Sequence, residues 1–288
     1  MADKISFNGQ LFERDGFWLS PANRSFRYGD GLFETIRVES GKILWAERHF
    51  KRLVRSAKLL KLDLPAGYGQ ESFSGDILKL CRENHGAGEA VRVRFSLFRH
   101  EGGFYKPDSG LADYLVETSL LKNNFYRLNA RGLLVDVFED YYKPCHGLST
   151  VKSSSALIYV MAGIYCKEKG LDDCLLINDE RLLAEATSSN LFLVKDQRLI
   201  TPSLDQGCVE GVMRAVIIDL ARTHGIQVAE RPIEPFELPE ADEVFLTNAI
   251  SGLQWVVGFR EKRYYNKMAR TLEDLLNKAS GDSITPVL

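Results

Sequence analysis

Residues 91–99 read Val-Arg-Val-Arg-Phe-Ser-Leu-Phe-Arg, and this alternation constrains the fold more than any other stretch of the chain. Apolar and polar side chains alternate with a period of two, which is the pattern of a β-strand with one buried face. Arg92 and Arg94 therefore lie on the same face of that strand. Two arginines on one face are favourable only next to water or anions, so this face is either an exposed edge or an anion site.

Strand and helix signals alternate along the chain, which predicts a mixed α/β (α+β) protein. The clearest signals are helices over 45–62, 74–84, 156–169, 212–223 and 266–279, and strands over 111–121, 132–138, 174–177, 191–194, 243–249 and 255–259. With 288 residues the chain is long enough for two domains. The polar stretch 121–128 predicts an interdomain linker between a small α/β domain, residues 1–120, and a larger domain, residues 129–288.

Lys152 lies just upstream of one of these expected helices. The apolar residues that follow it at helical spacing are Leu157, Val160, Met161 and Ile164. Serines precede them as N-caps and Gly170 ends the pattern, so we expect a buried helix over 156–169. A lysine held there loses hydration, which favours the neutral amine, and a neutral amine forms a Schiff base with an aldehyde. The alternative is a solvated surface charge.

The charge balance argues against a nucleic acid or an anionic membrane as partner. Lys+Arg 37 against Asp+Glu 39 gives a formal net charge of −2, and no basic run occurs. No apolar stretch approaches the length that spans a bilayer, and the first residues lack an apolar leader, so we expect a cytoplasmic protein. The five cysteines are scattered, which predicts reduced thiols, and without metal-ligand spacing we expect no metal site.

Three further positions favour an anionic or planar ligand, and each has an ordinary structural alternative. Arg52, at the edge of a helical apolar stripe, either snorkels to water or points its planar fork at a phosphate. Glu185, at a strand end beside small hydroxylated residues, either approaches a flat ligand or lies on the surface. Gly211, just before a helix, leaves backbone N–H groups open to an anion, although many helices begin this way without binding anything.

In their order and spacing these segments resemble the fold-type IV pyridoxal-phosphate enzymes, also called class IV aminotransferases, over nearly the whole chain. The motifs that carry the resemblance are Tyr28-Gly29-Asp30-Gly31, Phe33-Glu34-Thr35-Ile36-Arg37, His49 with Arg52-Leu53 and Ser56, Lys152, Glu185 with Ser189-Asn190-Leu191-Phe192, Glu210-Gly211-Val212-Met213-Arg214, and Thr247-Asn248-Ala249.

The resemblance implies a two-domain architecture in which pyridoxal 5'-phosphate lies between the domains and the larger domain is barrel-like. Lys152 matches the lysine that holds this cofactor as a Schiff base and moves a proton during catalysis. Glu185 matches the carboxylate that pairs with the pyridine nitrogen, so that the ring acts as an electron sink. The remaining positions of the implied cofactor-binding set are Arg52, Val212, Met213, Thr247 and Asn248.

The resemblance also implies a homodimer with shared active sites, in which the loop carrying Arg27 and Tyr28 reaches the neighbouring subunit. Tyr28, Phe33 and Thr35 match positions that line the substrate pocket. The arginines able to bind a substrate carboxylate are Arg27, Arg92, Arg94 and Arg181. Several arginines suit amino and 2-oxo acids with a second carboxylate, such as glutamate and 2-oxoglutarate.

We expect a transaminase that prefers D-amino acids, with 2-oxoglutarate or pyruvate as acceptor. The alternative is a 4-amino-4-deoxychorismate lyase, since Thr35 matches the catalytic threonine of the lyases and Thr247-Asn248-Ala249 resembles their phosphate turn. A branched-chain aminotransferase ranks third, because Thr35, Leu157 and Asn248 stand where that subfamily has glycine, tyrosine and threonine. The Arg-x-His carboxylate trap of D-amino-acid members is also missing after Phe98.

Overall fold

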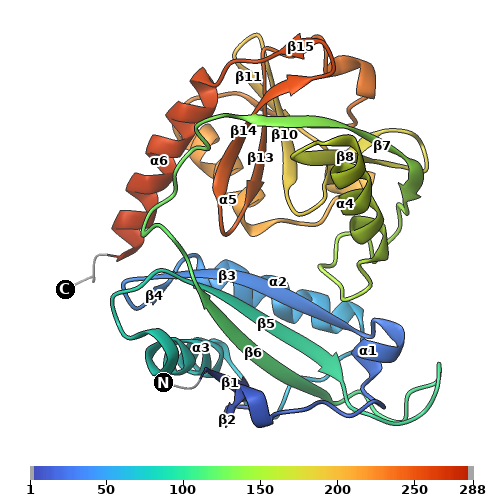
Figure 1. The fold of residues 1–288 in the computed structure, drawn as a ribbon, viewed down its shortest axis with the longest axis vertical. Helices are drawn as coiled ribbons and strands as arrows, with labels where there is room; N and C mark the ends of the chain where they lie inside the picture. The colour runs from blue at the N-terminus through green and yellow to red at the C-terminus, as the bar shows by residue number, and fades with distance from the viewer. Residues whose placement is uncertain (1–2, 285–288) are drawn as a thin grey trace. The chain divides into compact units, whose positions relative to one another are not determined.

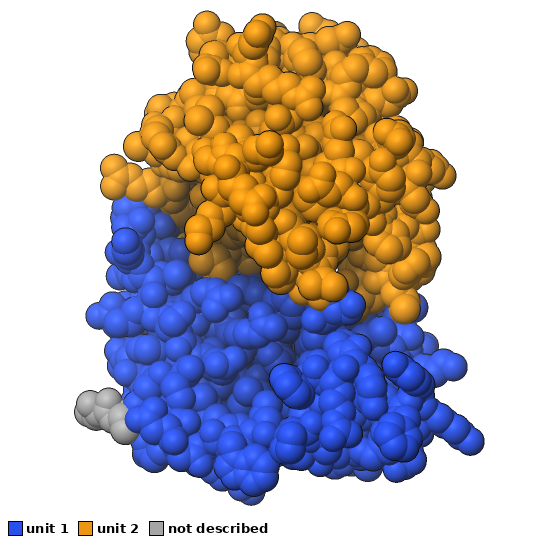
Figure 2. All heavy atoms as spheres, turned by 45° about the vertical axis from the view of Figure 1, so that its right-hand side comes forward, with its two compact units in different colours: residues 1–125, 152–155, 282–288 blue, residues 126–151, 156–281 orange. Residues whose placement is uncertain are grey.

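The computed structural model describes residues 3–284, which divide into two compact units (Figures 1 and 2). Among the described residues, the first unit comprises 3–125, 152–155 and 282–284, and the second comprises 126–151 and 156–281. The short segment that carries Lys152 thus packs with the first unit, although its neighbours in the chain belong to the second.

The first unit is an antiparallel sheet with the strand order β2-β1-β6-β5-β3-β4. Its elements are β1 (Lys4–Phe7), β2 (Gln10–Glu13), the 3-10 turn η1 (Arg14–Gly16), α1 (Arg24–Tyr28), β3 (Gly31–Glu39), β4 (Lys42–Ile43), α2 (Ala46–Leu59), α3 (Gln70–His85), β5 (Val91–Arg99) and β6 (Ala112–Leu120). The helices α2 and α3 cover one face, because Phe50 of α2 and Phe95 of β5 both pack against Phe73 of α3. The opposite face of β5 carries Arg92 and Arg94, as the alternation predicts.

The second unit is built on a sheet of mixed direction with the order β12-β11-β10-β13-β14-β7-β8-β9, and β15 pairs with β14. Its elements are β7 (Leu133–Lys143), α4 (Leu157–Lys169), β8 (Asp173–Asn178), β9 (Leu183–Ala186), β10 (Asn190–Lys195), β11 (Arg198–Thr201), η2 (Leu204–Gln206), α5 (Val212–Thr223), β12 (Val228–Glu230), η3 (Pro235–Glu237), β13 (Glu243–Asn248), β14 (Gly252–Phe259), β15 (Lys262–Arg263) and α6 (Lys267–Ile284).

This second sheet curls into a half-barrel. The strand β9 ends the order, yet the chain passes from it directly into β10, and the Ala186 N–H donates to the Ser189 carbonyl at 2.8 Å within that tight connection. The interior is filled by aliphatic side chains of the central strands, among them Leu175, Leu191 and Val244, all fully buried. The expected fold class, a small α/β domain plus a larger barrel-like one, is confirmed.

The expectation of a buried helix after Lys152 is wrong in two respects. The helix α4 forms and ends at Gly170 with φ 66°, but it has no side-chain N-cap from the serines. Of the expected apolar stripe only Met161 packs on the buried cluster, whereas Leu157 is 72% and Val160 is 55% exposed. The face that packs on the sheet of the same unit instead carries Ala162 and Cys166.

All five cysteines are free thiols, as their scatter predicts. Within residues 3–284, no helix is both long and apolar enough to cross a membrane.

Candidate active site

Lys152 lies against the start of β3 in the first unit. The Phe33 N–H donates to the Lys152 carbonyl, and the Ser154 N–H donates to the Gly31 carbonyl, both at 2.9 Å. These bonds hold residues 152–154 as a short antiparallel addition to the edge of the strand. The Lys152 Nζ lies 4.6 Å from the centroid of the Phe33 ring, so the amine is held over an aromatic face.

The face of the sheet that carries Phe33 also carries Arg92 and Arg94 of β5. Thr35 lies opposite Arg94 in the register of the two strands, and the Arg94 guanidinium carbon is 3.8 Å from the centroid of the Phe33 ring. In the described part of the chain, no carboxylate forms an ion pair with Arg92 or Arg94. Burial lowers the pKa of Arg94; Glu117 opposes this shift and Arg92 adds to it. A bound anion would therefore be favourable here.

Arg37, the third arginine on this face, is committed to the protein itself. Its Nε donates to Glu39 in a buried ion pair, and its Nη2 donates to the carbonyls of Asn123 at 2.5 Å and Phe125 at 3.2 Å. Arg37 therefore ties β3 to the end of the first unit, in contrast to Arg92 and Arg94.

Arg52 projects from α2 toward the other side of β3, where it meets Glu34. Its Nε donates to Oε1 of Glu34 at 2.7 Å and its Nη2 donates to Oε2 at 2.5 Å, a two-pronged contact. Nδ1 of His49, also on α2, lies 2.7 Å from the same Oε2. All three side chains are buried. Arg52 is therefore part of the buried face of α2 rather than the edge of an apolar stripe.

Electrostatics fix the charge states of this cluster. Burial alone would raise the pKa of Glu34, but the Arg52 charge and the hydrogen bonds from His49 and Arg52 lower it to about 2. Burial lowers the pKa of His49. A neutral His49 then donates from Nδ1 to the carboxylate, and its buried Nε2 has no hydrogen-bond partner among the described residues.

Glu185 is a buried carboxylate at the centre of the second unit. Its Oε1 accepts from Nζ of Lys143 in a buried ion pair and from the Tyr159 hydroxyl at 2.7 Å. Its Oε2 accepts from the Val209 N–H at 3.0 Å. The Lys143 Nζ also donates to the Ser149 carbonyl at 3.3 Å, in the segment that leads to residue 152. Glu185 is thus an internal residue of β9 and not a surface glutamate.

Asn190 connects the N-terminus of α5 with Thr247. A side chain at Gly211 would collide with the Asn190 amide oxygen, and Asn190 pairs with Thr247 in the register of β10 and β13. The helix has no side-chain cap, so the N–H groups of its first residues, Val212 and Met213, stay open to an anion. The buried Thr247 hydroxyl has no partner among the described residues.

Asn248 follows Thr247 and is fixed by its own turn. Its side-chain oxygen accepts the N–H groups of Ile250 at 3.0 Å and Ser251 at 2.8 Å, and its amide donates to the Ser189 hydroxyl at 3.0 Å. These contacts bring Ser189 and Asn248 together beside the unpartnered Thr247 hydroxyl.

The remaining arginine candidates lie elsewhere. Arg27 is exposed on α1 and its Nε donates to the Pro21 carbonyl at 2.8 Å. Tyr28 packs its ring 5.4 Å from that of Tyr105. Arg181 is exposed in the second unit with φ 63°, and its guanidinium carbon is 5.4 Å from the centroid of the Tyr142 ring.

Arg99 directly follows Phe98, where the Arg-x-His trap of the D-amino-acid members is missing. Its side chain binds groups of the protein itself. Its guanidinium donates to the carbonyls of Leu60 and Lys61, both at 2.8 Å, and to Asp30 at 2.9 Å. A buried arginine with these partners supports the loop around it and does not face a substrate.

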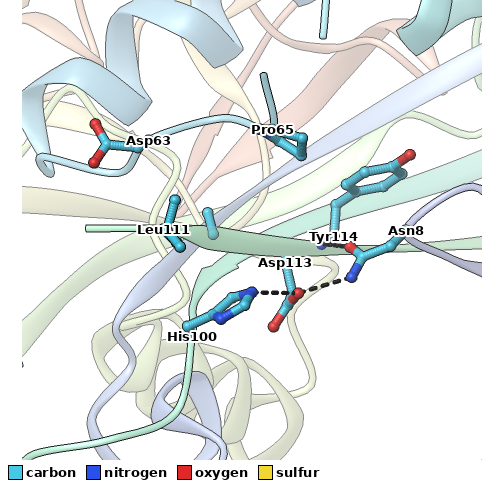
Figure 3. Close-up of a pocket in the computed structure, with 8 residues that line it drawn as sticks. Asn8, Asp63, Pro65, His100, Leu111, Asp113 and Tyr114 are labelled. Atoms are coloured by element: carbon cyan, nitrogen blue, oxygen red, sulfur yellow. Dashed lines mark hydrogen bonds and ion pairs between the residues drawn. The ribbon is translucent and has the colours of Figure 1, made fainter. Parts of the chain in front are cut away.

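One further pocket, of about 330 Å³, lies in the first unit and is lined by Asn8, Asp63, Pro65, His100, Leu111, Ala112, Asp113 and Tyr114 (Figure 3). Within it His100 and Asn8 both point at Asp113, at 2.8 and 2.7 Å. The donors of His100 and Asn8 are thus already paired. The carboxyl groups of Asp63 and Asp113 also make the pocket a poor site for a phosphate or a carboxylate.

Sequence reasoning gave no role to four residues of these clusters: Glu34, His49, Lys143 and Tyr159. Glu34 had a signal, because it shares the apolar side of its strand with Leu32 and Ile36, and a carboxylate there requires a buried partner. Tyr159 had a weaker one, since it shares a helical face with Ala162 and Cys166. Nothing in the sequence marks Lys143.

The chain belongs to the class IV aminotransferases, because residues 31–258 match the model of that family. A putative branched-chain-amino-acid aminotransferase of Methanocaldococcus jannaschii is 30% identical over 251 residues, 85% of this chain and 83% of that protein. A D-alanine aminotransferase of Listeria innocua is 27% identical over 248 residues, again 85% of this chain and 83% of that protein.

Two solved structures share the fold. A branched-chain aminotransferase from Thermoproteus uzoniensis with norvaline has a TM-score of 0.88 and 22% identity, covering 97% of this chain and 95% of that one. A putative 4-amino-4-deoxychorismate lyase from Legionella pneumophila has a TM-score of 0.80 and 25% identity, covering 92% and 96%. The match to the family model and the two aminotransferase relatives show an enzyme of the transaminase class.

Class IV aminotransferases use pyridoxal 5'-phosphate, and the donor set of this chain fits that cofactor. The uncapped start of α5 and the unpartnered Thr247 hydroxyl suit a phosphate. The Lys152 amine suits an aldehyde, and the Glu185 carboxylate suits a protonated ring nitrogen.

Proposed function

We propose that Lys152 and Glu185 are the catalytic pair of this transaminase. Lys152 would hold the cofactor through its aldehyde and would move the proton at the substrate Cα. Glu185 would hold a proton on the ring nitrogen. For the phosphate, we propose the N–H groups of Val212 and Met213 with four side chains, those of Arg52, Ser189, Thr247 and Asn248.

Bound pyridoxal phosphate supplies an electron sink for the bonds at the substrate Cα. The protein supplies the groups that act on it. The carboxylate of Glu185 is buried and ion-paired with Lys143, so water would not compete with a ring nitrogen for it. The Lys152 amine is half-buried and lies over the Phe33 ring, so an aromatic face replaces part of its hydration shell.

The observation that carries our substrate proposal is the pair of contacts on Phe33. One aromatic ring is contacted by the Lys152 amine at 4.6 Å and by the Arg94 guanidinium at 3.8 Å. An amino or 2-oxo acid has its reacting carbon next to a carboxylate, so a reactive amine and an anion-binding cation around one side chain suit that substrate class.

We propose that the substrates include acids with a second carboxylate, such as glutamate and 2-oxoglutarate, with D-amino acids preferred. Arg94 and Arg92 have no internal ion-pair partner in the described chain, which supports two anionic groups on this face. The similarity to the D-alanine aminotransferase of Listeria innocua agrees with this choice.

Two other activities have specific support. The lyase candidate rests on Thr35, whose register opposite Arg94 puts a hydroxyl on the substrate face, and on the fold of the Legionella pneumophila protein. The branched-chain candidate rests on the Methanocaldococcus jannaschii relative at 30% identity. Against it stands Arg94, because a half-buried arginine without a counter-ion is unfavourable beside an apolar substrate side chain.

The experiment is a set of half-reactions with the purified yellow protein. D-glutamate, D-alanine, L-leucine and aminodeoxychorismate are each added, and the absorbance band of the bound cofactor is followed. Loss of the band with D-glutamate supports the proposal, and Arg94→Gln is expected to raise KM for glutamate roughly tenfold or more. Faster conversion of L-leucine contradicts it, and pyruvate released without an amino acceptor identifies the lyase.

We further propose that the enzyme is a homodimer in the cytoplasm and that Arg27 and Tyr28 serve the partner's site. Large apolar side chains are exposed near α1 and on the loop after β5: Trp18, Phe26, Phe104 and Tyr105. Surface of this kind is typical of a protein interface. Light scattering tests the dimer, and Arg27→Gln should raise KM for both acids while cofactor binding is kept.

A further inference from the structure

Three hydrogen-bond donors surround Glu185, and they are unevenly shared between its two oxygens. Oε1 accepts from Lys143 and from the Tyr159 hydroxyl, whereas Oε2 accepts only from the Val209 N–H at 3.0 Å. A carboxylate oxygen has two lone pairs in its plane. Oε1 is thus saturated, and Oε2 keeps one acceptor position for a further donor.

Tyr159 is held in place to make this contact. It lies in the first turn of α4, shortly after Lys152 in the chain, and packs against the buried cluster of Phe138, Ala162 and Leu176. Burial raises the pKa of the Tyr159 phenol and the Glu185 charge raises it further, so the hydroxyl keeps its proton and remains a donor. Tyr159 therefore gives Glu185 a permanent hydrogen bond at 2.7 Å.

We propose that Tyr159 is a positioning residue of the transaminase, which occupies Oε1 of Glu185 together with Lys143 and so commits Oε2 to the ring nitrogen of the cofactor. This inference rests on the proposed role of Glu185. Leu157 stands where the branched-chain aminotransferases have a tyrosine. Here the phenol comes from Tyr159 and contacts the carboxylate of Glu185.

A phenol is well suited to this task because it donates a hydrogen bond without adding a charge. Lys143 also orients Glu185, but its positive charge opposes a second positive charge on the ring nitrogen. A second cation in place of Tyr159 would weaken the electron sink further. Without any donor there, the terminal torsion of the glutamate has a broad minimum and Oε2 loses its fixed direction.

The test compares two ligands and three proteins. The ligands are pyridoxal phosphate and its analogue in which the ring nitrogen is replaced by C–H, which cannot donate to Glu185. The proteins are the parent, Tyr159→Phe, and Tyr165→Phe as matched control, since Tyr165 lies on the same helix and packs its ring on Phe138. The dissociation constant of each apo-protein for each ligand is measured by fluorescence titration.

We expect the parent to prefer pyridoxal phosphate over the analogue, and Tyr159→Phe to reduce this preference about threefold to tenfold, the range for the net contribution of a typical hydrogen bond. Tyr165→Phe should keep the parent's preference. Equal weakening of both ligands by Tyr159→Phe would show a purely structural role and overturn the inference, as would no change at all. A parent without any preference would instead overturn the role of Glu185 itself, and the inference with it.

Discussion

Glu34 in the first unit and Glu185 in the second are both buried carboxylates with one cationic partner, yet their oxygens are used differently. The planar fork of Arg52 takes both oxygens of Glu34, and His49 takes a further lone pair on Oε2. Lys143, a point charge, meets only Oε1 of Glu185, and Tyr159 completes that oxygen. The choice of arginine or lysine thus decides whether a second oxygen is left for a ligand.

The comparison separates a residue that holds the fold from one that is available for chemistry. Glu34 fixes α2 to β3 through a cluster of buried groups in which both of its oxygens are occupied. Glu185 is equally buried, but its donors leave one direction open. A buried carboxylate is therefore not by itself a sign of a catalytic site; the distribution of its donors carries that information.

The largest expected effect is on stability, at Glu34. Glu34→Gln keeps the shape of the side chain but leaves the buried Arg52 charge unpaired, which is expected to lower the free energy of unfolding by about 3–5 kcal/mol. Urea unfolding of the apo-protein measures it. The matched control is Glu47→Gln, whose partner Lys51 lies at 2.5 Å on the exposed surface of α2, and it should leave stability unchanged. Equal stability of Glu34→Gln and Glu47→Gln would show that the buried ion pair of Glu34 contributes no more than the exposed pair of Glu47.

The next effect is on turnover, at Glu185. Glu185→Gln removes the charge that holds the proton on the ring nitrogen, and turnover should fall by about two orders of magnitude or more. The same change strands the buried Lys143 charge and lowers stability. The double variant Glu185→Gln with Lys143→Met removes both charges, so it should recover stability but not turnover. Recovery of turnover in the double variant would show that Glu185 matters only as a counter-ion.

The smallest effect is the dependence of stability on pH. Burial lowers the pKa of His49, so below about pH 6.5 the unfolded chain binds a proton that the folded protein does not. The free energy of unfolding therefore decreases as the pH is lowered below about 6.5, by up to about 1.4 kcal/mol per pH unit. Glu34, with a pKa of about 2 against an ordinary 4.5, adds a second loss between these values. Unfolding from pH 8 to 5 should be less pH-dependent in His49→Gln. The exposed His224→Gln is the control, and identical slopes in all three proteins would contradict this origin.

Most of the fold follows from periodicity. The alternation over 91–99 gave β5 and its two faces, and the stripe and glycine stop after Lys152 gave α4. The faces of helices were harder to predict. Most of the apolar stripe of α4 is exposed, and the buried face of α2 contains His49, Arg52 and Ser56, of which His49 and Arg52 pair with Glu34 of β3. Periodicity within one helix cannot show which of its polar residues will pair with a neighbouring strand.

For the same reason, the sequence predicts only part of the candidate site. Lys152, Glu185 and the start of α5 stand in recognisable motifs, so a sequence resemblance locates them. Lys143 and Tyr159 reach Glu185 from β7 and α4, and this contact exists only after the strands have paired. Of the arginines, Arg92 and Arg94 share one face of β5, as the alternation predicts, whereas Arg99 supports its own loop.

The lysine that carries the cofactor can be identified by chemical trapping. The holoenzyme is reduced with borohydride and digested, and the peptide that carries the pyridoxyl group is identified by mass spectrometry. We expect modification of Lys152 and a colourless, unmodified Lys152→Ala variant. Attachment at Lys143, the other lysine of these clusters, or at any other lysine, would contradict this expectation.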